Sequence, residues 1–177
     1  MTIIPYKYLK WTFYTAILLL IYYMQFTTGL MPELIGIRPL PVIPFVICVA
    51  MYEGEVYGGV FGIIAGLLWD FSANRVLGFN AIVLMILGIA VGLIITYLMQ
   101  NNIYSAMILC GSSIFAIELF DWFFYYLLWG YDKPIYVFFR YYILIMIYTS
   151  AFIPGFHYFF KWIKPQIKEG SQDNSIN

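Results

Sequence analysis

Long apolar runs separated by short polar breaks dominate the chain and predict a bundle of membrane-spanning helices. Six apolar segments can be marked, at residues 11–28, 39–52, 54–71, 79–99, 104–128 and 135–160. Four of them approach or exceed the roughly 20 residues that a helix needs to cross a bilayer, and the third is at the lower limit. The pattern predicts an all-α integral membrane protein, with one six-span domain at residues 1–164 and a short polar cytoplasmic tail at 165–177. The last stretch of the tail, EGSQDNSIN at 169–177, is expected to be disordered.

The second segment is the weakest candidate for a span, because it is short and contains three prolines. Pro39 and Pro41 suit the first turn of a helix, whereas Pro44 would lie near that turn or kink the helix. A short or broken span is tolerated where protein rather than lipid covers it. We count it as a span on that condition.

Glycine recurs at every fourth position through the third segment: Gly54, Gly58, Gly62 and Gly66. Glycines four apart form a ridge without side chains, which lets a neighbouring membrane helix approach closely. Each glycine lowers the stability of a water-exposed helix by about 1 kcal/mol. The contacts that the close approach allows must therefore stabilise the protein by more than that. Gly88 and Gly92 form a shorter ridge in the fourth segment and are a candidate partner for the first. The ridge has two possible uses, packing within this chain or against another protein.

Composition supports the membrane assignment. Hydrophobic residues make up 63% of the chain and charged residues 10%, against roughly 45–50% and 25% in soluble domains. The mean hydropathy is +0.85. Aromatic residues make up 21%, and many lie near the expected span ends, as in interfacial belts. The net charge is zero, and nothing in the charge pattern indicates nucleic-acid binding.

Basic residues orient the chain. With a cytoplasmic N-terminus and six spans, the inner side carries Lys7, Lys10, Lys161, Lys164 and Lys168. The outer side carries Arg38, Arg75, Lys133 and the nearby Arg140. The two tails hold all the lysines but one, so both termini are predicted to be cytoplasmic in a multi-pass protein of the cell membrane.

Three charges lie inside the last two segments. Glu118 and Asp121 are three residues apart and thus share a helix face, while Arg140 lies early in the sixth segment. Counting from the turn between these helices places Asp121 and Arg140 at similar depth, which predicts an ion pair between them. Charges at membrane depth usually pair in this way. Two interpretations stay open, a purely structural pair and a proton or ligand pathway that uses Glu118.

A second group of charges is expected at the rims. Arg38 precedes the second segment and Asp70 closes the third, so Asp70 can pair with Arg38 or Arg75, or cap the turn that follows. Glu53 and Glu55 flank the turn between the second and third segments, where we expect them to be solvated; contact with a basic surface of a partner is the alternative.

Candidate chemistry is sparse. His157 is the one histidine and has no companions at ligand spacing, so no metal or cofactor is expected. Ser113 and His157 differ by eight residues in expected depth, or ~12 Å along a helix, too far for a nucleophile and its base. Cys48 and Cys110 lie in apolar runs and are read as buried side chains. The chain is not expected to be an enzyme.

The stretch from Arg38 to Gly92 resembles the signature region of the rod shape-determining protein MreD family. The residues that carry this resemblance are Arg38-Pro39 before the second segment, GIIAGLLWD from Gly62 to Asp70, and Leu77-Gly78 before the fourth segment. The chain length and the six-span plan also fit. The acids at Glu118 and Asp121 are a departure from the family pattern.

The resemblance implies a non-enzymatic membrane scaffold of the bacterial cell-wall elongation machinery, needed for cell shape. Such a protein would bind MreC, a single-span bitopic protein, and through it act with the MreB filament and the wall-synthesis enzymes. The family also resembles the six-helix substrate-binding subunits of energy-coupling-factor transporters. A small-molecule binding subunit for transport is therefore the alternative function. Either protein would be in contact with membrane lipids.

Overall fold

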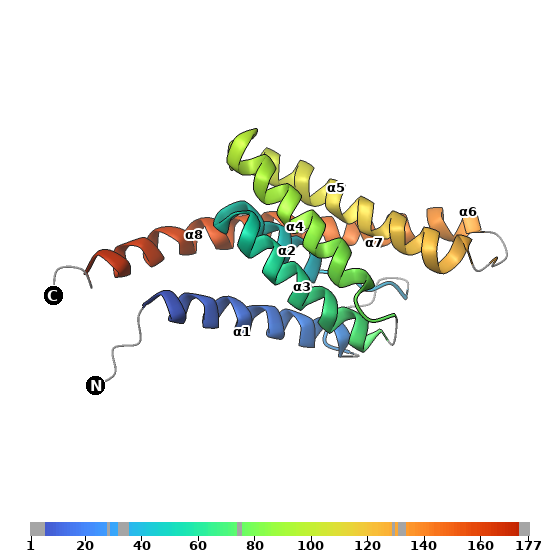
Figure 1. Ribbon diagram of the computed structural model, residues 1–177. Helices are drawn as coiled ribbons and strands as arrows, with labels where there is room; N and C mark the ends of the chain where they lie inside the picture. The colour runs from blue at the N-terminus through green and yellow to red at the C-terminus, as the bar shows by residue number, and fades with distance from the viewer. Residues whose placement is uncertain are drawn as a thin grey trace.

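The computed structural model describes the backbone of residues 6–27, 29–31, 36–73, 76–128, 130 and 134–173, and the side chains of those between 10 and 163. Every element in these ranges is a helix. They are α1 (Tyr6–Phe26), α2 (Val42–Glu53), α3 (Glu55–Ser72), α4 (Phe79–Tyr97), α5 (Ile103–Trp122), the π-helix η1 (Phe123–Leu127), α6 (Pro134–Val137), the π-helix η2 (Phe138–Tyr142), α7 (Ile143–Ser150) and α8 (Phe152–Asp173) (Figure 1).

Within the described residues the helices form six rods that run back and forth along one long axis. Each of the first four helices is one rod, α5 continues into η1, and α6, η2, α7 and α8 follow one another in the last rod. α1 begins and α8 ends at the same end of the bundle (Figure 1). The prediction of an all-helical bundle is confirmed.

α2 forms the centre of the bundle. All ten residues from Val42 to Met51 are buried, and the helix packs against α1, α3, α4, α5 and α8. At 12 residues it is only ~18 Å long, well short of the ~30 Å apolar core of a bilayer. Protein therefore covers the short, proline-rich second segment, as its length and composition required.

A sharp turn at Gly54 separates α2 from α3. Its φ of 94° lies in a region that residues with a side chain rarely adopt, and its N–H closes the last turn of α2 by bonding to the carbonyl of Ala50 at 3.0 Å. Gly54 was expected to begin the glycine ridge. That prediction is wrong, because the backbone reverses direction at Gly54 and the ridge begins at Gly58.

The last rod departs from a regular α-helix at two places. η2 lies opposite η1 across the hairpin, where the rings of Tyr126 and Tyr142 are 6.4 Å apart. Further on, Ala151 separates α7 from α8. Pro154 lacks the N–H that would bond to the carbonyl of Ser150, and the N–H of Ala151 bonds to the carbonyl of Tyr148 at 3.3 Å in a tighter turn.

α8 also extends beyond the predicted domain boundary. It is helical through Asp173, so residues 169–173 of the stretch expected to be disordered are part of a helix. Extending an existing helix needs no new nucleation, and this stretch contains good helix formers such as Gln166, Lys168 and Glu169. Residues 174–177 lie outside the described part of the chain.

Candidate functional site

Among the described residues, the most extensive helix contact joins α3 to α4, and their glycines meet in it. A Cβ added to Gly62 would lie 2.5 Å from the carbonyl oxygen of Leu84, and one added to Gly58 would lie 2.8 Å from the carbonyl oxygen of Gly88. Real Cβ atoms essentially never come so close to another atom. The structure therefore places the ridge inside the chain, against α4, where no larger residue fits.

The same contact continues along both helices in opposite directions. Gly66 faces the backbone of Ala81 at one end, and Gly92 faces Glu55 at the other, where a Cβ on Gly92 would lie 2.9 Å from the Cβ of Glu55. The two glycine runs that the sequence singled out thus meet each other in antiparallel helices. This contact fixes α3 and α4 as one unit.

Asp70 connects the end of α3 to the start of α4. It is fully buried, and its carboxylate accepts hydrogen bonds from the N–H of Gly78 at 2.8 Å, the N–H of Asn80 at 3.2 Å and the side-chain amide of Asn80 at 2.7 Å. These N–H groups belong to the first turn of α4, which has no helical partners for them. Of the alternatives considered for Asp70, the structure shows the cap.

Arg38 is half-buried in the segment that leads into α2. It makes none of the hydrogen bonds that hold the Asp70 carboxylate. Arg75, the other candidate partner of Asp70, lies outside the described residues. A carboxylate near the N-terminus of a helix is also stabilised by the helix dipole. Backbone and amide N–H donors at the start of the next helix therefore stabilise the Asp70 carboxylate.

Polar side chains from distant elements satisfy the two ends of α2. At its start, the N–H of Val42 bonds to Gln25 Oε1 at 3.3 Å, and the N–H of Leu40 bonds to Thr149 Oγ1 at 3.0 Å. At its end, Asn101 Nδ2 donates to the carbonyl of Met51 at 3.0 Å. Helix ends carry backbone groups without intrahelical partners, and a buried helix must find them elsewhere. α1, α7 and the turn after α4 supply them.

An ion pair that the sequence reading missed ties α1 to α2. Lys10 pairs with Glu53, which also accepts a hydrogen bond from the hydroxyl of Tyr14 at 3.1 Å. Glu53 was expected to be solvated. That prediction is wrong, because α1 lies beside the end of α2 and presents a lysine and a tyrosine to it. Trp11 stacks on Tyr57 of α3 with ring centroids 3.9 Å apart, so the same turn of α1 also contacts α3.

The acids of α5 are buried, as their shared face indicated. Glu118 is 3% exposed and Asp121 is 7% exposed. The hydroxyl of Tyr142 donates to Asp121 Oδ2 at 3.3 Å. Arg140, in contrast, lies on the exposed side of η2, and its Nη1 donates to the hydroxyl of Tyr136 at 2.9 Å.

The predicted ion pair between Asp121 and Arg140 therefore does not form. Counting from the turn gave the right depth but no information on rotation about the helix axis. Arg140 is two residues from Tyr142, and each residue turns a helix by about 100°, so the two side chains point to nearly opposite sides. A π-helical stretch such as η2 changes that rotation further, and no sequence signal announces it.

The remaining candidate residues, His157, Ser113, Cys48 and Cys110, are all buried. His157 is 3% exposed, and its Nδ1 lies 3.3 Å from the hydroxyl of Tyr52. Ser113 Oγ donates to the carbonyl of Leu109 at 2.7 Å. The side chains of Cys48 and Cys110 are both buried. Among the described residues, no group of three or more His, Cys, Asp or Glu side chains could hold a metal ion.

An open apolar groove of about 480 Å³ lies between α1 and the last rod. Phe13, Ile17 and Leu20 line it from α1, and Ala151, Gly155 and Phe159 line it from the other side. Ala151 and Gly155 are four residues apart and exposed, and a Cβ added to Gly155 would meet no atom within 4 Å. This pair of small residues is thus available to a helix outside the chain.

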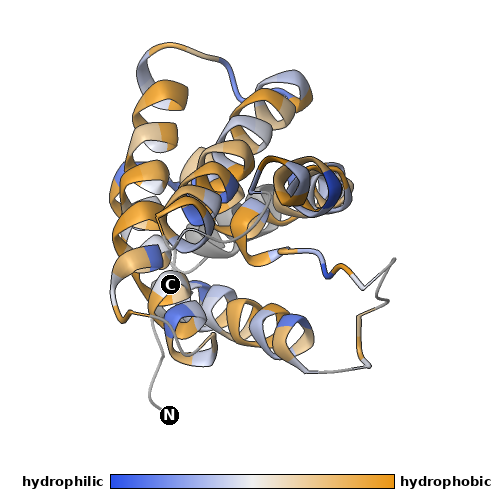
Figure 2. Ribbon diagram, turned by 90° about the vertical axis from the view of Figure 1, so that its right-hand side faces the viewer, coloured by the Kyte–Doolittle hydropathy of each residue, from blue (hydrophilic) through white to orange (hydrophobic). Residues whose placement is uncertain are grey.

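In the part of the chain that the structure describes, three helical stretches are long and apolar enough to cross a membrane, namely 79–97, 103–127 and 134–163. Large apolar side chains are also exposed on the rods: Leu20 is 60% exposed, Ile108 61% and Ile147 63%. The ribbon in Figure 2 is coloured as hydrophobic along much of the helices. Soluble monomeric proteins rarely expose so many large apolar side chains. Together these observations indicate a helical membrane protein.

Comparison with protein-family models, with proteins of known function and with solved structures finds no match to this chain.

Proposed function

We propose that this chain is a membrane scaffold of the bacterial cell-wall elongation machinery, as its resemblance to the MreD family implies. It spans the cytoplasmic membrane six times with both termini in the cytoplasm, binds an MreC-like bitopic protein, and through it links MreB to peptidoglycan synthesis. It performs no chemistry of its own.

One observation carries the proposal. The residues that resemble the family signature fall together on one unit, α2–α3–α4, and the structure gives several of them a specific packing role. Gly62 and Gly66 close the contact with α4, and Asp70 caps α4 through the N–H of Gly78. Pro39 is buried where the chain enters α2. A signature made of packing residues suits a protein that works by holding a fixed shape.

The architecture gives the proposal further support. Six rods that alternate in direction, with the start of α1 and the end of α8 at one end (Figure 1), suit an even number of crossings. Lysines concentrate toward that end in the sequence, which favours its cytoplasmic placement.

The groove between α1 and the last rod is the site where we place the partner's single membrane-spanning helix. Its walls are apolar, so its occupant carries no charge at that depth. Small residues four apart favour an α-helix over an acyl chain, because they let a helix backbone approach closely. The equivalent positions of α3 and α4 are already occupied within the chain, whereas Ala151 and Gly155 are open.

Co-purification from detergent-solubilised membranes tests the site. Gly155→Leu should fill the groove and lower recovery of the bitopic partner at least about tenfold, because it removes the close approach that drives membrane helix association. Gly111→Leu is the matched control, since Gly111 also has no atom within 4 Å of an added Cβ and lies outside the groove lining. We expect the control to recover the partner at the wild-type level.

Three outcomes would contradict parts of the proposal. Equal recovery with both variants would remove the partner from this groove. Co-purification of an ATP-hydrolysing module in place of wall enzymes would favour the alternative function, a transporter subunit. Turnover of a substrate by the purified chain alone would exclude a scaffold without chemistry.

A further inference from the structure

One side of the last rod is exposed along most of its length. Residues at intervals of three and four positions share one side of a helix, and this side consists of Arg140, Leu144, Ile147, Ala151 and Gly155. All five residues are exposed. Tyr142 and Thr149 lie on the opposite side of the rod and are buried. We call the five exposed residues the seam, which runs from η2 through α7 to α8.

A cavity lies at each end of the seam. Ala151 and Gly155 line the groove shared with α1, where the proposed function places a partner helix. Arg140 and Leu144 line a second cavity of about 350 Å³, together with Ile37 from the segment before α2. Arg140 and Gly155 are separated by about 22 Å of helix, which is less than the length of one membrane-spanning helix. A single helix on the seam can therefore contact both cavities.

Arg140 brings a positive charge to the second cavity. Its Nη1 donates to the hydroxyl of Tyr136 at 2.9 Å, and the guanidinium lies 5.8 Å from the centre of the same ring. Among the described residues, no carboxylate lies within ion-pair distance of Arg140. A guanidinium has five N–H donors in a planar fork that fits a carboxylate, and a tyrosine hydroxyl neutralises none of its charge. Charged side chains on membrane-spanning helices usually pair with an opposite charge.

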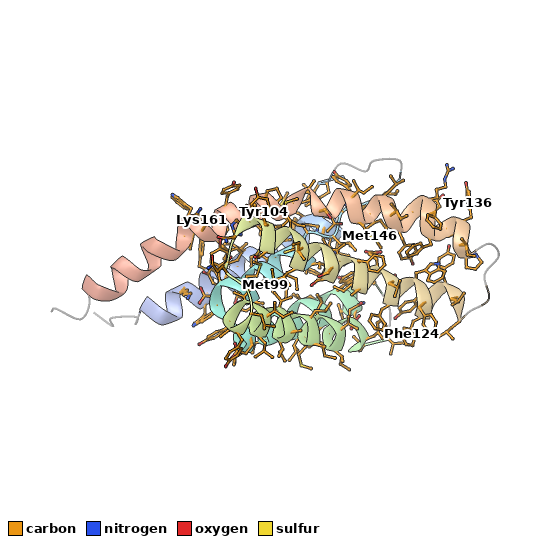
Figure 3. The ribbon with its side chains drawn as sticks, turned by 90° about the horizontal axis from the view of Figure 1, so that it is seen from above. Met99, Tyr104, Phe124, Tyr136, Met146 and Lys161 are labelled. Atoms are coloured by element: carbon orange, nitrogen blue, oxygen red, sulfur yellow. The ribbon has the colours of Figure 1, made fainter. Side chains whose placement is uncertain are left out.

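Exposed tyrosines place Arg140 near the surface of the membrane. Tyr136 and Tyr141 beside it are 56% and 43% exposed, and tyrosine side chains concentrate at the headgroup level of a bilayer. Figure 3 shows Tyr136 at the hairpin end of the last rod and Lys161 toward the other end. The seam is therefore charged at its hairpin end and apolar from there to Gly155.

The length of the seam favours a helix over a lipid as its occupant. One leaflet contributes about 15 Å of the apolar core of a bilayer, so a lipid whose phosphate meets Arg140 covers only part of the seam. A helix covers all of it, and the small residues Ala151 and Gly155 allow the backbone of that helix to approach closely.

We propose that the helix on the seam carries an aspartate or a glutamate whose carboxylate pairs with the Arg140 guanidinium. This acid lies roughly 22 Å along the partner helix from the residue that contacts Gly155. The inference rests on the proposed function, since it specifies the charge of the same partner helix. Complementary charges fix the register of two partners. Here one such pair also fixes the direction of the helix, which small residues alone leave open.

Zero-length cross-linking in membranes that contain the full-length chain tests the pair directly. Arg140→Lys keeps the positive charge and adds an amine, which a carbodiimide joins to a carboxylate in contact with it. We expect one dominant cross-link, to an aspartate or glutamate near one end of a single membrane-spanning helix. Lys161 has a native amine toward the other end of the rod (Figure 3), so it is the internal control and should not join that acid.

Co-purification measures how much the pair contributes to binding. Arg140→Gln should lower recovery of the bitopic partner about fivefold, as expected for the loss of one ion pair near a surface. Arg140→Glu should lower recovery further, because two like charges then meet. Lys161→Gln removes an exposed charge outside the seam and should recover the partner at the wild-type level.

Two outcomes separate this inference from the proposed function. Loss of the partner with Gly155→Leu but not with Arg140→Gln would keep the helix in the groove and remove the acid. Wild-type recovery with both variants would remove the helix from the seam, and with it the docking site of the proposed function.

Three further results bear on the charge itself. Equal losses with Arg140→Gln and Lys161→Gln would reduce the effect to general attraction between charges and overturn the pair. Loss of bound phosphatidylglycerol from purified Arg140→Gln, without any protein cross-link from Arg140→Lys, would assign the opposite charge to a lipid phosphate. If Arg140→Glu does not fold, the cross-link from Arg140→Lys still decides, because its absence overturns the pair.

Discussion

The contact of α3 with α4 and the groove between α1 and the last rod both contain small residues at spacing four, yet the chain uses them in opposite ways. In the first, a Cβ on Gly62 would collide with the backbone of Leu84; in the second, a Cβ on Gly155 would meet nothing. The spacing alone therefore does not distinguish internal packing from a free surface. What lies opposite the small residue decides its role.

A third region, the hairpin of η1 and η2, differs from the α3–α4 contact in how its polar groups are satisfied. Around α2, α3 and α4, buried polar groups such as Asp70 and Thr149 bond to backbone N–H groups of other segments. In the hairpin, side chains bond to each other, Tyr142 to Asp121 in a buried position and Arg140 to Tyr136 on an exposed face.

Among these variants, Gly62→Leu should lower the stability of the fold most, because Gly62 is packed against the backbone of α4. Gly62→Leu places a side chain against the backbone of α4, which can yield only if the helices separate, so we expect a loss of about 3 kcal/mol or more. Thermal unfolding in detergent measures it, with Gly111→Leu as the control that should melt close to the wild type. If Gly62→Leu unfolded at the same temperature as the control, the difference between glycines packed against another helix and glycines with free space beside them would be refuted.

Removal of the α4 cap should have an intermediate effect. Asp70→Ala leaves the N–H groups of Gly78 and Asn80 without their acceptor, and we expect a loss of about 2 kcal/mol. Amide hydrogen exchange at these two groups should accelerate along with the fall in thermal stability. In the double variant with Arg38→Gln, the losses of stability from the two substitutions should add. Strong coupling between the two substitutions would instead indicate an ion pair between Asp70 and Arg38.

The smallest effect is expected in the hairpin region. Tyr142→Phe and Asp121→Asn should be coupled by about 1 kcal/mol, the typical value of one hydrogen bond, whereas Arg140→Gln should add independently to either variant. Double-mutant cycles on detergent unfolding measure both couplings. Coupling between Arg140 and Asp121 with none to Tyr142 would mean that η2 is rotated from its position in the structure.

Features that depend on local spacing could be predicted from the sequence. The apolar runs predicted where the helical rods lie, because a run of about twenty apolar residues is typical of a helix that crosses a membrane. The glycine spacing indicated a close helix contact, and Gly88 and Gly92 were the right candidates to complete it. The cap formed by Asp70 was one of the open alternatives, since an acid before a short loop and a new helix is a familiar arrangement.

Features that depend on rotation or on tertiary neighbours could not be predicted. Arg140 has the depth of Asp121 but the wrong direction, and the π-helical stretches that set this direction have no sequence signature. Glu53 was expected in water because nothing in the sequence indicates that Lys10 lies beside it. Gly54 fitted the spacing of the ridge, but its backbone conformation belongs to a turn.

The enclosure of α2 constrains the order in which the chain can mature in a membrane. Its N–H groups bond to Gln25 and Thr149, which lie on opposite sides of it in the sequence, and α8 covers part of its surface. As the ribosome releases the chain, this ~18 Å helix is too short to settle across the bilayer alone. Its full set of contacts, with α8 and with Thr149 among them, can form only after the last rod is synthesised.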